Sequence, residues 1–339
     1  MKRATQKDVA ARAGVSRATV SYVLNGRTDG TIRVSDETRQ KVLDAIGSLR
    51  YRVNLTARGL KTRRSHLLAV LVPDLGNPFY PMLIRGAQKM AHASGYRILV
   101  FDSFSTREDE LDFLKMALDR IADGLILAAS YLDDSHIKIL RDEGIPSVGI
   151  GPYLRNTGID TLSIDQPAAV HALIEHLVSR GHTRVGHITG DLNNINGRIR
   201  YDAFRAEMAA RGLPVDPRHI LEGDFLREGA ARKVEQWLSS LAPGERPTAV
   251  FAANDLMAIE AITAARRLGL SVPEDLAVCG FDNIPEAEFV EPPLTTVGLD
   301  VEAMGRRAAT LLIDRIAGTR VAGPEQVGLD FNFYARRSA

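Results

Sequence analysis

The chain of 339 residues is too long for one ordinary domain and suits a small module joined to a two-lobed body. With 45% hydrophobic and 25% charged residues, its composition is that of a globular protein with several cores, which excludes a disordered chain. The net charge of +1 hides an asymmetry, because residues 1–66 contain 15 Lys and Arg against 5 Asp and Glu, whereas the rest contains 28 against 37. A basic module on an acidic body indicates that the first part meets a polyanion. The alternative is a solubilising basic tail.

The single cysteine, Cys279, excludes an internal disulfide and fits a reducing compartment. Its apolar neighbours predict a buried strand residue and not a nucleophile. The residues after Met1 contain no apolar core typical of a signal peptide, and no apolar run reaches the ~18 residues of a membrane span. We therefore expect a cytoplasmic protein without a membrane partner.

Two short helices joined by a turn are expected near the amino end. Thr5 and Asp8 predict a capped helix start, and Gly14 ends this helix where a left-handed turn suits it. Ser16 can cap a second helix, which Asn25 ends. The apolar residues that would bury one face of the pair are Val9, Ala10, Ala13, Val15, Val20, Val23 and Leu24. This spacing favours a helix-turn-helix over an arbitrary helical hairpin, and in a helix-turn-helix the second helix enters the major groove.

A third helix is expected after Ser35, with Asp36 and Glu37 in its first turn. Its inward face is predicted to consist of Val42, Leu43, Ile46 and Leu49. Together with the first two helices, the chain here resembles the headpiece of the LacI/GalR family of bacterial repressors. The residues that carry the resemblance are Asp8-Val9-Ala10, Ala13-Gly14-Val15-Ser16, Thr19-Val20-Ser21, Asn25, Thr38-Arg39, Tyr51, Asn54, Ala57-Arg58 and Leu60.

The resemblance implies a set of DNA contacts. Ser16, Arg17 and Ala18 would read base edges, Arg17 by a bidentate contact to guanine, with Tyr22 one turn later at a position often basic in the family. Thr19, Ser21 and Asn25 would hold phosphates. The alternative for Arg17 is a solvated surface arginine. The expected DNA-binding set is completed by Thr5, Tyr51, Asn54, Ala57, Leu60 and Lys61.

The segment 54–61 resembles the family's hinge, which implies a helix that forms in the minor groove only on DNA. Eight residues fall below the ~12 to 15 that an isolated helix needs, and Gly59 weakens it further. Leu60 would wedge between central base pairs, with Lys61 close to the same groove. The alternative is that Leu60 packs under the body.

From Leu67 onward, short apolar runs alternate with amphipathic helical stretches, which predicts two lobes built on parallel sheets. The expected strands of the first lobe lie at 67–72, 98–101, 124–127 and 147–150, and those of the second at 185–188, 219–221, 249–252 and 277–280. We predict an all-α headpiece (1–53) and a hinge or linker (54–65), followed by an α/β body. Its lobes would comprise 66–162 with 297–323 and 163–296 with 324–339.

The body is similar to periplasmic sugar-binding proteins, as seen in Asn77-Pro78-Phe79-Tyr80, Asn254-Asp255, Gly280-Phe281-Asp282 and Pro292-Pro293-Leu294-Thr295-Thr296. The resemblance implies an effector cleft lined by Phe79, Tyr80, Arg198, Phe225, Asn254 and Asp282. Aromatic faces can pack on the C–H surface of a polyol, while the polar groups orient it. Alternatively, Phe79 or Phe225 belongs to the core, and Arg198 and Asp282 form an ion pair with one another.

These features predict a sequence-specific transcriptional regulator, a repressor whose operator affinity is controlled by a sugar or polyol. We expect it to act as a homodimer on a near-palindromic operator, without a cofactor or metal. An enzyme is not expected, because the chain contains no phosphate loop, dinucleotide fingerprint or nucleophile elbow. The alternative is a solute-binding protein without DNA function, which would lack the basic module.

Overall fold

The computed structural model describes residues 4–25, 34–51, 64–128, 131–154 and 157–339. The chain forms two compact units, Met1–Ser65 and His66–Ala339. Within the described ranges, no helix is long and apolar enough to cross a membrane.

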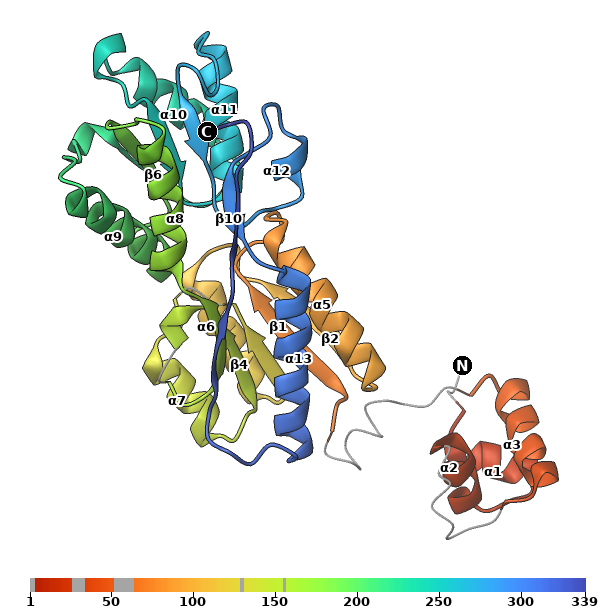
Figure 1. Cartoon of the computed structure of the whole chain (residues 1–339). Coiled ribbons are helices and arrows are strands. Elements are labelled where there is room, and N and C mark those ends of the chain that lie inside the picture. Colours follow the sequence, from red (N-terminus) through yellow and green to blue (C-terminus); the bar gives the residue numbers. More distant parts are fainter. Residues whose placement is uncertain (1–3, 26–33, 52–63, 129–130, 155–156) are drawn as a thin grey trace. The chain divides into compact units, whose positions relative to one another are not determined.

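The described part of the first unit contains the helices α1 (Gln6–Ala13), α2 (Arg17–Asn25) and α3 (Asp36–Ser48) (Figure 1). At the start of α1, the Asp8 carboxylate accepts a hydrogen bond from the backbone N–H of Thr5 at 2.8 Å, and the Thr5 side chain accepts from the Asp8 N–H. Gly14 ends the helix at φ 65°, a conformation that residues with a Cβ rarely adopt. The turn therefore forms as the sequence predicts.

The three helices bury one small core, centred on Val9, Val20 and Val42. Leu43 was expected in this core, but 46% of it is exposed. On α3 the buried positions are Val42 and Ala45, with Ile46 and Leu49 packed against them. Each residue turns a helix by about 100°, so Leu43 points away from this stripe. The expectation for Leu43 was wrong.

The first lobe of the second unit contains a six-stranded parallel sheet in the order β11-β5-β4-β3-β1-β2. Alternate residues of β1 pack under different helices, because successive side chains of a strand point to opposite faces. Leu68, Val70 and Val72 lie under α5 and α13, whereas Ala69 and Leu71 lie under α6 and α7. The elements are β1 (Leu67–Val72), α5 (Phe79–Ala93), β2 (Arg97–Asp102), α6 (Arg107–Leu118), β3 (Gly124–Leu127), α7 (Asp134–Asp142), β4 (Ser147–Ile150), the 3-10 turn η1 (Pro152–Leu154), β5 (Asp160–Ile164), α13 (Val301–Ala317) and β11 (Gln326–Leu329).

The second lobe contains a four-stranded parallel sheet in the order β7-β6-β8-β9. One core lies between this sheet and the helices α10 and α11, and a second core lies between the opposite face of the sheet and the helices α8 and α9. Cys279 lies in β9 and is fully buried, as predicted. The elements are α8 (Gln166–Ser179), β6 (Val185–Thr189), α9 (Ile195–Ala210), η2 (Pro217–His219), β7 (Ile220–Glu222), α10 (Ala230–Ser239), η3 (Pro243–Glu245), β8 (Ala249–Ala252), α11 (Asp255–Arg267), β9 (Ala277–Cys279) and α12 (Glu286–Phe289).

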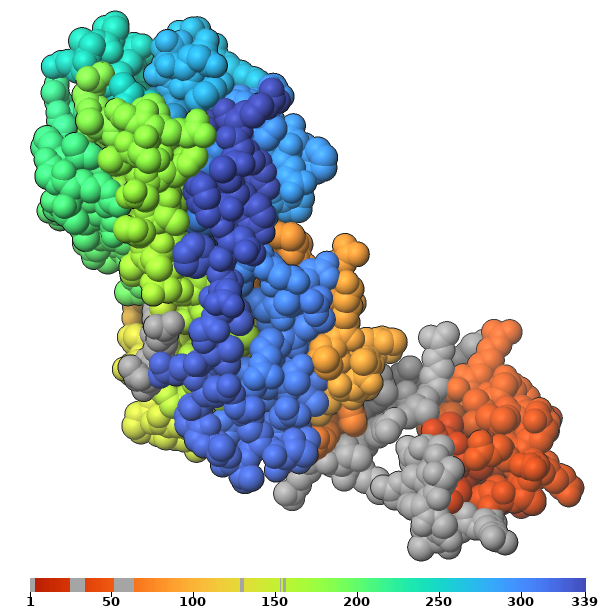
Figure 2. Space-filling model, in the orientation of Figure 1, coloured from red at the N-terminus to blue at the C-terminus, as the bar shows by residue number. Residues whose placement is uncertain are grey.

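The chain passes between the lobes after β5, after β10 (Thr296–Gly298) and after β11. The last passage leads to β12 (Asn332–Tyr334), which pairs antiparallel with β10. Figure 2 shows this carboxy-terminal segment, in dark blue, running over the surface of both lobes. We expected 324–339 to belong to the second lobe, but β11 extends the first lobe's sheet by pairing with β5. The predicted boundary between 162 and 163 also cuts through β5, whose residues up to Ile164 pair with β11 in the same sheet. The remaining lobe boundaries stay predictions.

Candidate DNA-binding surface and effector cavity

The amino end of α2 presents a continuous exposed surface. The Ser16 hydroxyl caps this end by accepting the backbone N–H of Thr19 at 3.0 Å. Ser16, Arg17 and Ala18 are all exposed, and the Arg17 guanidinium makes no hydrogen bond or ion pair with the described part of the chain. A free guanidinium at the start of an exposed helix can approach a base edge.

The remaining predicted DNA contacts are distributed around this surface. Thr19, Ser21 and Tyr22 on α2 are half-buried, so each exposes part of its side chain. Thr5 is exposed beside the start of α1, and Tyr51 packs against the small core. Their contact with DNA stays a prediction. The side chain of Asn25 and residues Asn54, Ala57, Leu60 and Lys61 lie outside the described residues.

A cavity lies between the two lobes of the second unit and encloses about 970 Å³, including the part open to solvent. Its walls come from the carboxyl ends of the parallel strands, where α/β sheets usually bind ligands. The lining from the first lobe is mainly nonpolar and includes Pro73, Phe79, Tyr80, Ala128, Ile150, Gly151, Pro152 and Leu299. The lining from the second lobe is mainly polar and includes Gln166, Asn194, Asn196, Arg200, Asn254 and Asp282.

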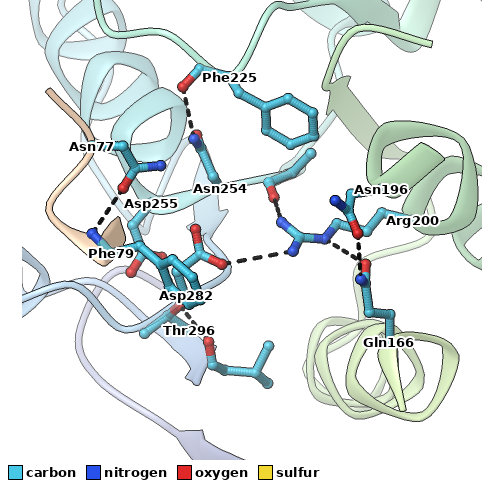
Figure 3. Close-up of polar contacts among 12 residues, drawn as sticks. Asn77, Phe79, Gln166, Asn196, Arg200, Phe225, Asn254, Asp255, Asp282 and Thr296 are labelled. Atoms are coloured by element: carbon cyan, nitrogen blue, oxygen red, sulfur yellow. Dashed lines mark hydrogen bonds and ion pairs between the residues drawn. The ribbon is translucent and has the colours of Figure 1, made fainter. Parts of the chain in front are cut away.

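Arg200 is the centre of the polar wall (Figure 3). Its Nε donates to Oε1 of Gln166 at 2.9 Å, and its Nη1 donates to the carbonyl oxygen of Ala253. Its Nη2 lies 3.7 Å from Oδ1 of Asp282, and the guanidinium carbon lies 3.7 Å from the centre of the Phe281 ring. These contacts fix the guanidinium plane of Arg200, which lines the cavity.

Two family models match the chain. Residues 5–54 match bacterial regulatory proteins of the lacI family, and residues 174–339 match a periplasmic binding protein-like domain. Over 319 residues the chain is 35% identical to the HTH-type transcriptional repressor CytR of Escherichia coli (strain K12), covering 94% of this chain and 91% of the relative. The chain belongs to the lacI family.

Other relatives agree with this membership. The chain is 34% identical over 306 residues to catabolite control protein A of Priestia megaterium, covering 90% of each. A solved structure of the Lac repressor dimer bound to operator and the anti-inducer ONPF matches with a TM-score of 0.85 and 26% identity, over 99% of both chains. The protein is therefore a DNA-binding transcriptional regulator with a helix-turn-helix headpiece and a two-lobed α/β body, which confirms the expected fold class and the expected DNA-binding function. Its control by an effector stays a prediction.

In this lacI-family regulator, Phe79, Tyr80, Phe225, Asn254 and Asp282 all line the cavity, as the sequence analysis expected. Their contact with an effector stays a prediction. Arg198 does not line the cavity, so its assignment to the cleft wall is corrected. It is exposed, and its Nη2 donates to the carbonyl oxygen of Leu192 at 3.1 Å.

Arg200 occupies the place that was assigned to Arg198. On α9, Arg200 shares a buried stripe with Gly197, Phe204 and Met208, whereas Arg198 lies outside it. The spacing of these apolar residues could have identified Arg200 from the sequence, because residues four apart share a helix face. The other polar lining residues that sequence analysis missed are Asp74, Asn77, Ser105, Ser163, Gln166, Asn194 and Asn196.

Asp282 is one of the two acidic residues among the described lining of this family member's cavity, with Asp74. It is 8% exposed and has a strained backbone at φ 115°. Burial raises the pKa of the Asp282 carboxyl to about 7, opposed by the guanidinium of Arg200 and increased by the nearby carboxylate of Asp255. No hydrogen bond from another side chain of the described residues reaches the Asp282 carboxylate, so its oxygens can accept bonds from a ligand.

The carboxyl group next to the cavity, Asp255, is used structurally. Its Oδ1 accepts from the Thr296 hydroxyl at 2.6 Å, and its Oδ2 accepts from the N–H of Ile284 at 2.8 Å. Burial raises the pKa of Asp255 to about 6 in spite of these bonds. Asn254 caps α11 by accepting the Met257 N–H at 2.9 Å, and its amide also donates to the carbonyl oxygen of Phe225 at 2.8 Å.

The aromatic side chains are held in fixed orientations. The rings of Phe79 and Tyr80 meet edge to face at 5.3 Å between centres. Burial raises the pKa of the Tyr80 hydroxyl, and the Asp282 carboxylate adds to this effect. Phe225 has φ 67°, and its ring covers Gly190 so closely that a Cβ there would lie 2.0 Å from it. A larger residue at position 190 would displace the ring from the cavity wall.

Proposed function

We propose that this regulator is a homodimeric repressor whose operator affinity is set by a small, uncharged sugar or polyol bound between its lobes. One observation carries the proposal. The same chain has an exposed arginine, Arg17, at the amino end of α2 and a cavity with one polar wall. An effector can change operator affinity only by binding one lobe arrangement better than another, and a shift from 1:99 to 99:1 needs roughly 5.5 kcal/mol of differential affinity.

The charges of the cavity support an uncharged effector. Arg200 is the one cation among the described lining residues, and Asp282 already faces it at 3.7 Å. Asp74 adds a further carboxylate to the lining. A phosphate or carboxylate ligand would be repelled by these two carboxylates and would find no unpaired cation in the described lining. The hydroxyl groups of a neutral ligand, in contrast, can donate to Asp282 and accept from Arg200.

Calorimetry tests this effector class with neutral monosaccharides and polyols, each compared with its phosphate ester. We expect at least one neutral compound to bind, with affinity lost in Asp282→Ala, and every phosphate ester to bind at least tenfold more weakly. The same variant should keep operator affinity and lose the effector response. A phosphate ester that binds more tightly than its neutral parent would contradict the proposed class.

On the DNA side, we propose that Arg17 reads a guanine. Arg17→Ala should relax preference at one operator position, worth about 1 to 3 kcal/mol. Lys41→Ala is the matched control, because it also removes one positive charge but lies on α3, where Lys41 pairs with Glu37 at 2.8 Å. Competition binding with a library of operator variants measures both proteins, and unchanged base preference in Arg17→Ala would remove the assignment.

Exposed apolar residues of the body support a homodimer. Leu75, Val100 and Phe104 lie on or beside β2, the edge strand of the first sheet, and are 42%, 39% and 73% exposed. In the second lobe, Phe289 at the end of α12 is 84% exposed. Apolar side chains on an open sheet edge favour pairing with another copy. Sedimentation equilibrium should give a dimer for the parent and a weakened dimer for Phe104→Asp.

A further inference from the structure

A hydrogen bond joins the two lobes outside the lining of the cavity. The hydroxyl of Tyr131 donates to Oδ2 of Asp191 at 3.0 Å. Tyr131 belongs to the loop between β3 and α7 of the first lobe, and Asp191 to the loop between β6 and α9 of the second. We propose that Tyr131 and Asp191 form a latch that stabilises this lobe arrangement and positions the polar wall for the effector.

The first lobe holds Tyr131 firmly. The backbone N–H groups of Tyr131 and Leu132 both donate to Oε2 of Glu110, at 2.8 and 3.1 Å. Glu110 is fully buried on α6, and Leu132 is buried in the core under α6 and α7. The next residue, Asp133, caps α7 by accepting the Ser135 N–H at 2.9 Å. The position of the phenol is therefore set by the first lobe itself.

The second lobe holds Asp191 equally well. Its Oδ1 accepts from the backbone N–H of Asn193 at 2.8 Å, and its carbonyl oxygen accepts from the Asn194 N–H at 3.0 Å. A Cβ at Gly197 would lie 2.4 Å from the Asp191 carbonyl oxygen, so α9 packs directly on this loop.

The Asp191 loop leads into the polar wall. Asn194 lines the cavity and caps α9, and Asn196 and Arg200 on that helix line the cavity too. The Tyr131 hydroxyl therefore links a rigid part of the first lobe to the segment that presents three polar groups to the effector. Because the bond needs both lobes in this arrangement, its loss should increase the population of other arrangements.

Burial of the phenol and its bond to Asp191 raise the pKa of Tyr131 to about 12, so the hydroxyl keeps its proton at neutral pH. A hydrogen bond to a charged group contributes more than one between neutral groups. We expect Tyr131→Phe, which removes only the hydroxyl oxygen, to increase the ratio of unlatched to latched protein about tenfold. When the latched arrangement is the one that binds, the effector affinity should fall in proportion to the latched fraction.

The test measures lobe separation directly in the full-length protein. Cys279 is buried, so spin labels can be placed on introduced cysteines at two exposed positions, Glu143→Cys in the first lobe and Arg232→Cys in the second. Without effector or DNA, Tyr131→Phe should broaden the distribution of label distances toward longer values. Tyr201→Phe is the control, because Tyr201 packs within the second lobe against His187 and Arg205.

A double-mutant cycle with Asp191→Ala separates the latch from a purely local role. Loss of the same bond should make the effects of the two substitutions on lobe separation non-additive. Additive effects, or a Tyr131→Phe distribution identical to that of the parent, would overturn the latch. The inference that the latch tunes effector affinity rests on the proposed function. Absence of any effector response in all variants would refute that function, while the distance measurements would still decide whether the latch exists.

Discussion

Replacing Arg200 with methionine should disable the cavity, whereas the same change at Arg198 should not. Arg200 is 8% exposed and donates to Gln166 and Ala253 while facing Asp282. Methionine keeps much of the side-chain length but removes every donor. The substitution therefore leaves a buried carboxylate without its cation and two acceptors without a partner.

The cost can be worked out from these contacts. Removing one member of a buried ion pair typically destabilises a protein by about 3 to 5 kcal/mol. The two orphaned acceptors share the same donor group, so their penalties overlap with this value and do not add to it. In a domain of this size, each kcal/mol lowers the melting temperature by about 2 to 4 °C, so we expect a decrease of roughly 6 to 20 °C. Loss of a charged donor to the ligand should weaken effector binding about 10- to 150-fold.

The assay combines thermal unfolding with calorimetry below the transition of each variant. Arg198→Met is the matched control on the same helix, and it should change the free energy of unfolding by less than about 0.5 kcal/mol because Arg198 is exposed. Arg200→Lys retains the positive charge and should recover part of the stability. Loss of effector affinity in Arg198→Met but not in Arg200→Met would show that Arg198, and not Arg200, serves the cavity.

Three further outcomes are expected. Because the pKa of Asp282 is near 7 and a protonated carboxyl is a poorer acceptor, effector affinity should fall about tenfold for each pH unit below 7. Calorimetry at several pH values measures this dependence, and Asp282→Asn should flatten it. Burial lowers the pKa of His187 from 6.5 to about 4, so its contribution of about 3 kcal/mol to the free energy of unfolding is present above pH 6.5 and lost as the pH falls toward 4. In urea unfolding, the stability of His187→Phe should therefore fall by that much less than the stability of the parent over this pH range. An equal loss of stability in both proteins would contradict the assignment. Gly86→Ala should destabilise the first lobe by several kcal/mol in the same urea assay, because the Cβ of alanine would lie 2.0 Å from the Glu302 carbonyl oxygen. An unchanged free energy of unfolding would argue against the tight contact of α5 with α13.

Sequence patterns predicted the headpiece and most sheet strands because local rules determine these elements. Thr5, Gly14 and Ser16 act within four residues of their partners, so capping and turn chemistry are visible in the sequence. The continuous apolar runs at 67–72 and 249–252 coincide with β1 and β8, since buried parallel strands are apolar on both faces. The error at Leu43 came from extending the apolar stripe by one residue.

The elements that sequence analysis missed depend on distant partners. β11 has alternating burial and lies at a sheet edge, where its place is determined by β5, more than 160 residues earlier in the chain. β10 and β12 have three residues each and pair with one another across more than 30 residues of the chain. Such short segments carry no periodic signal of their own. The Tyr131–Asp191 bond was invisible for the same reason, because nothing in either local sequence indicates the other residue.

The contacts of Asp282 explain how the cavity can govern the arrangement of the lobes. Its backbone N–H donates to the carbonyl oxygen of Val297 at 2.7 Å, so the strained residue that lines the cavity is bonded to β10. The preceding residue of β10, Thr296, is fixed to Asp255 at 2.6 Å. β10 leads directly into α13, where Gly305 packs against the Leu83 carbonyl oxygen of α5 without room for a Cβ. A close-packed chain of contacts of this kind resists local bending, so we expect an effector that displaces Asp282 to move one lobe against the other as a whole.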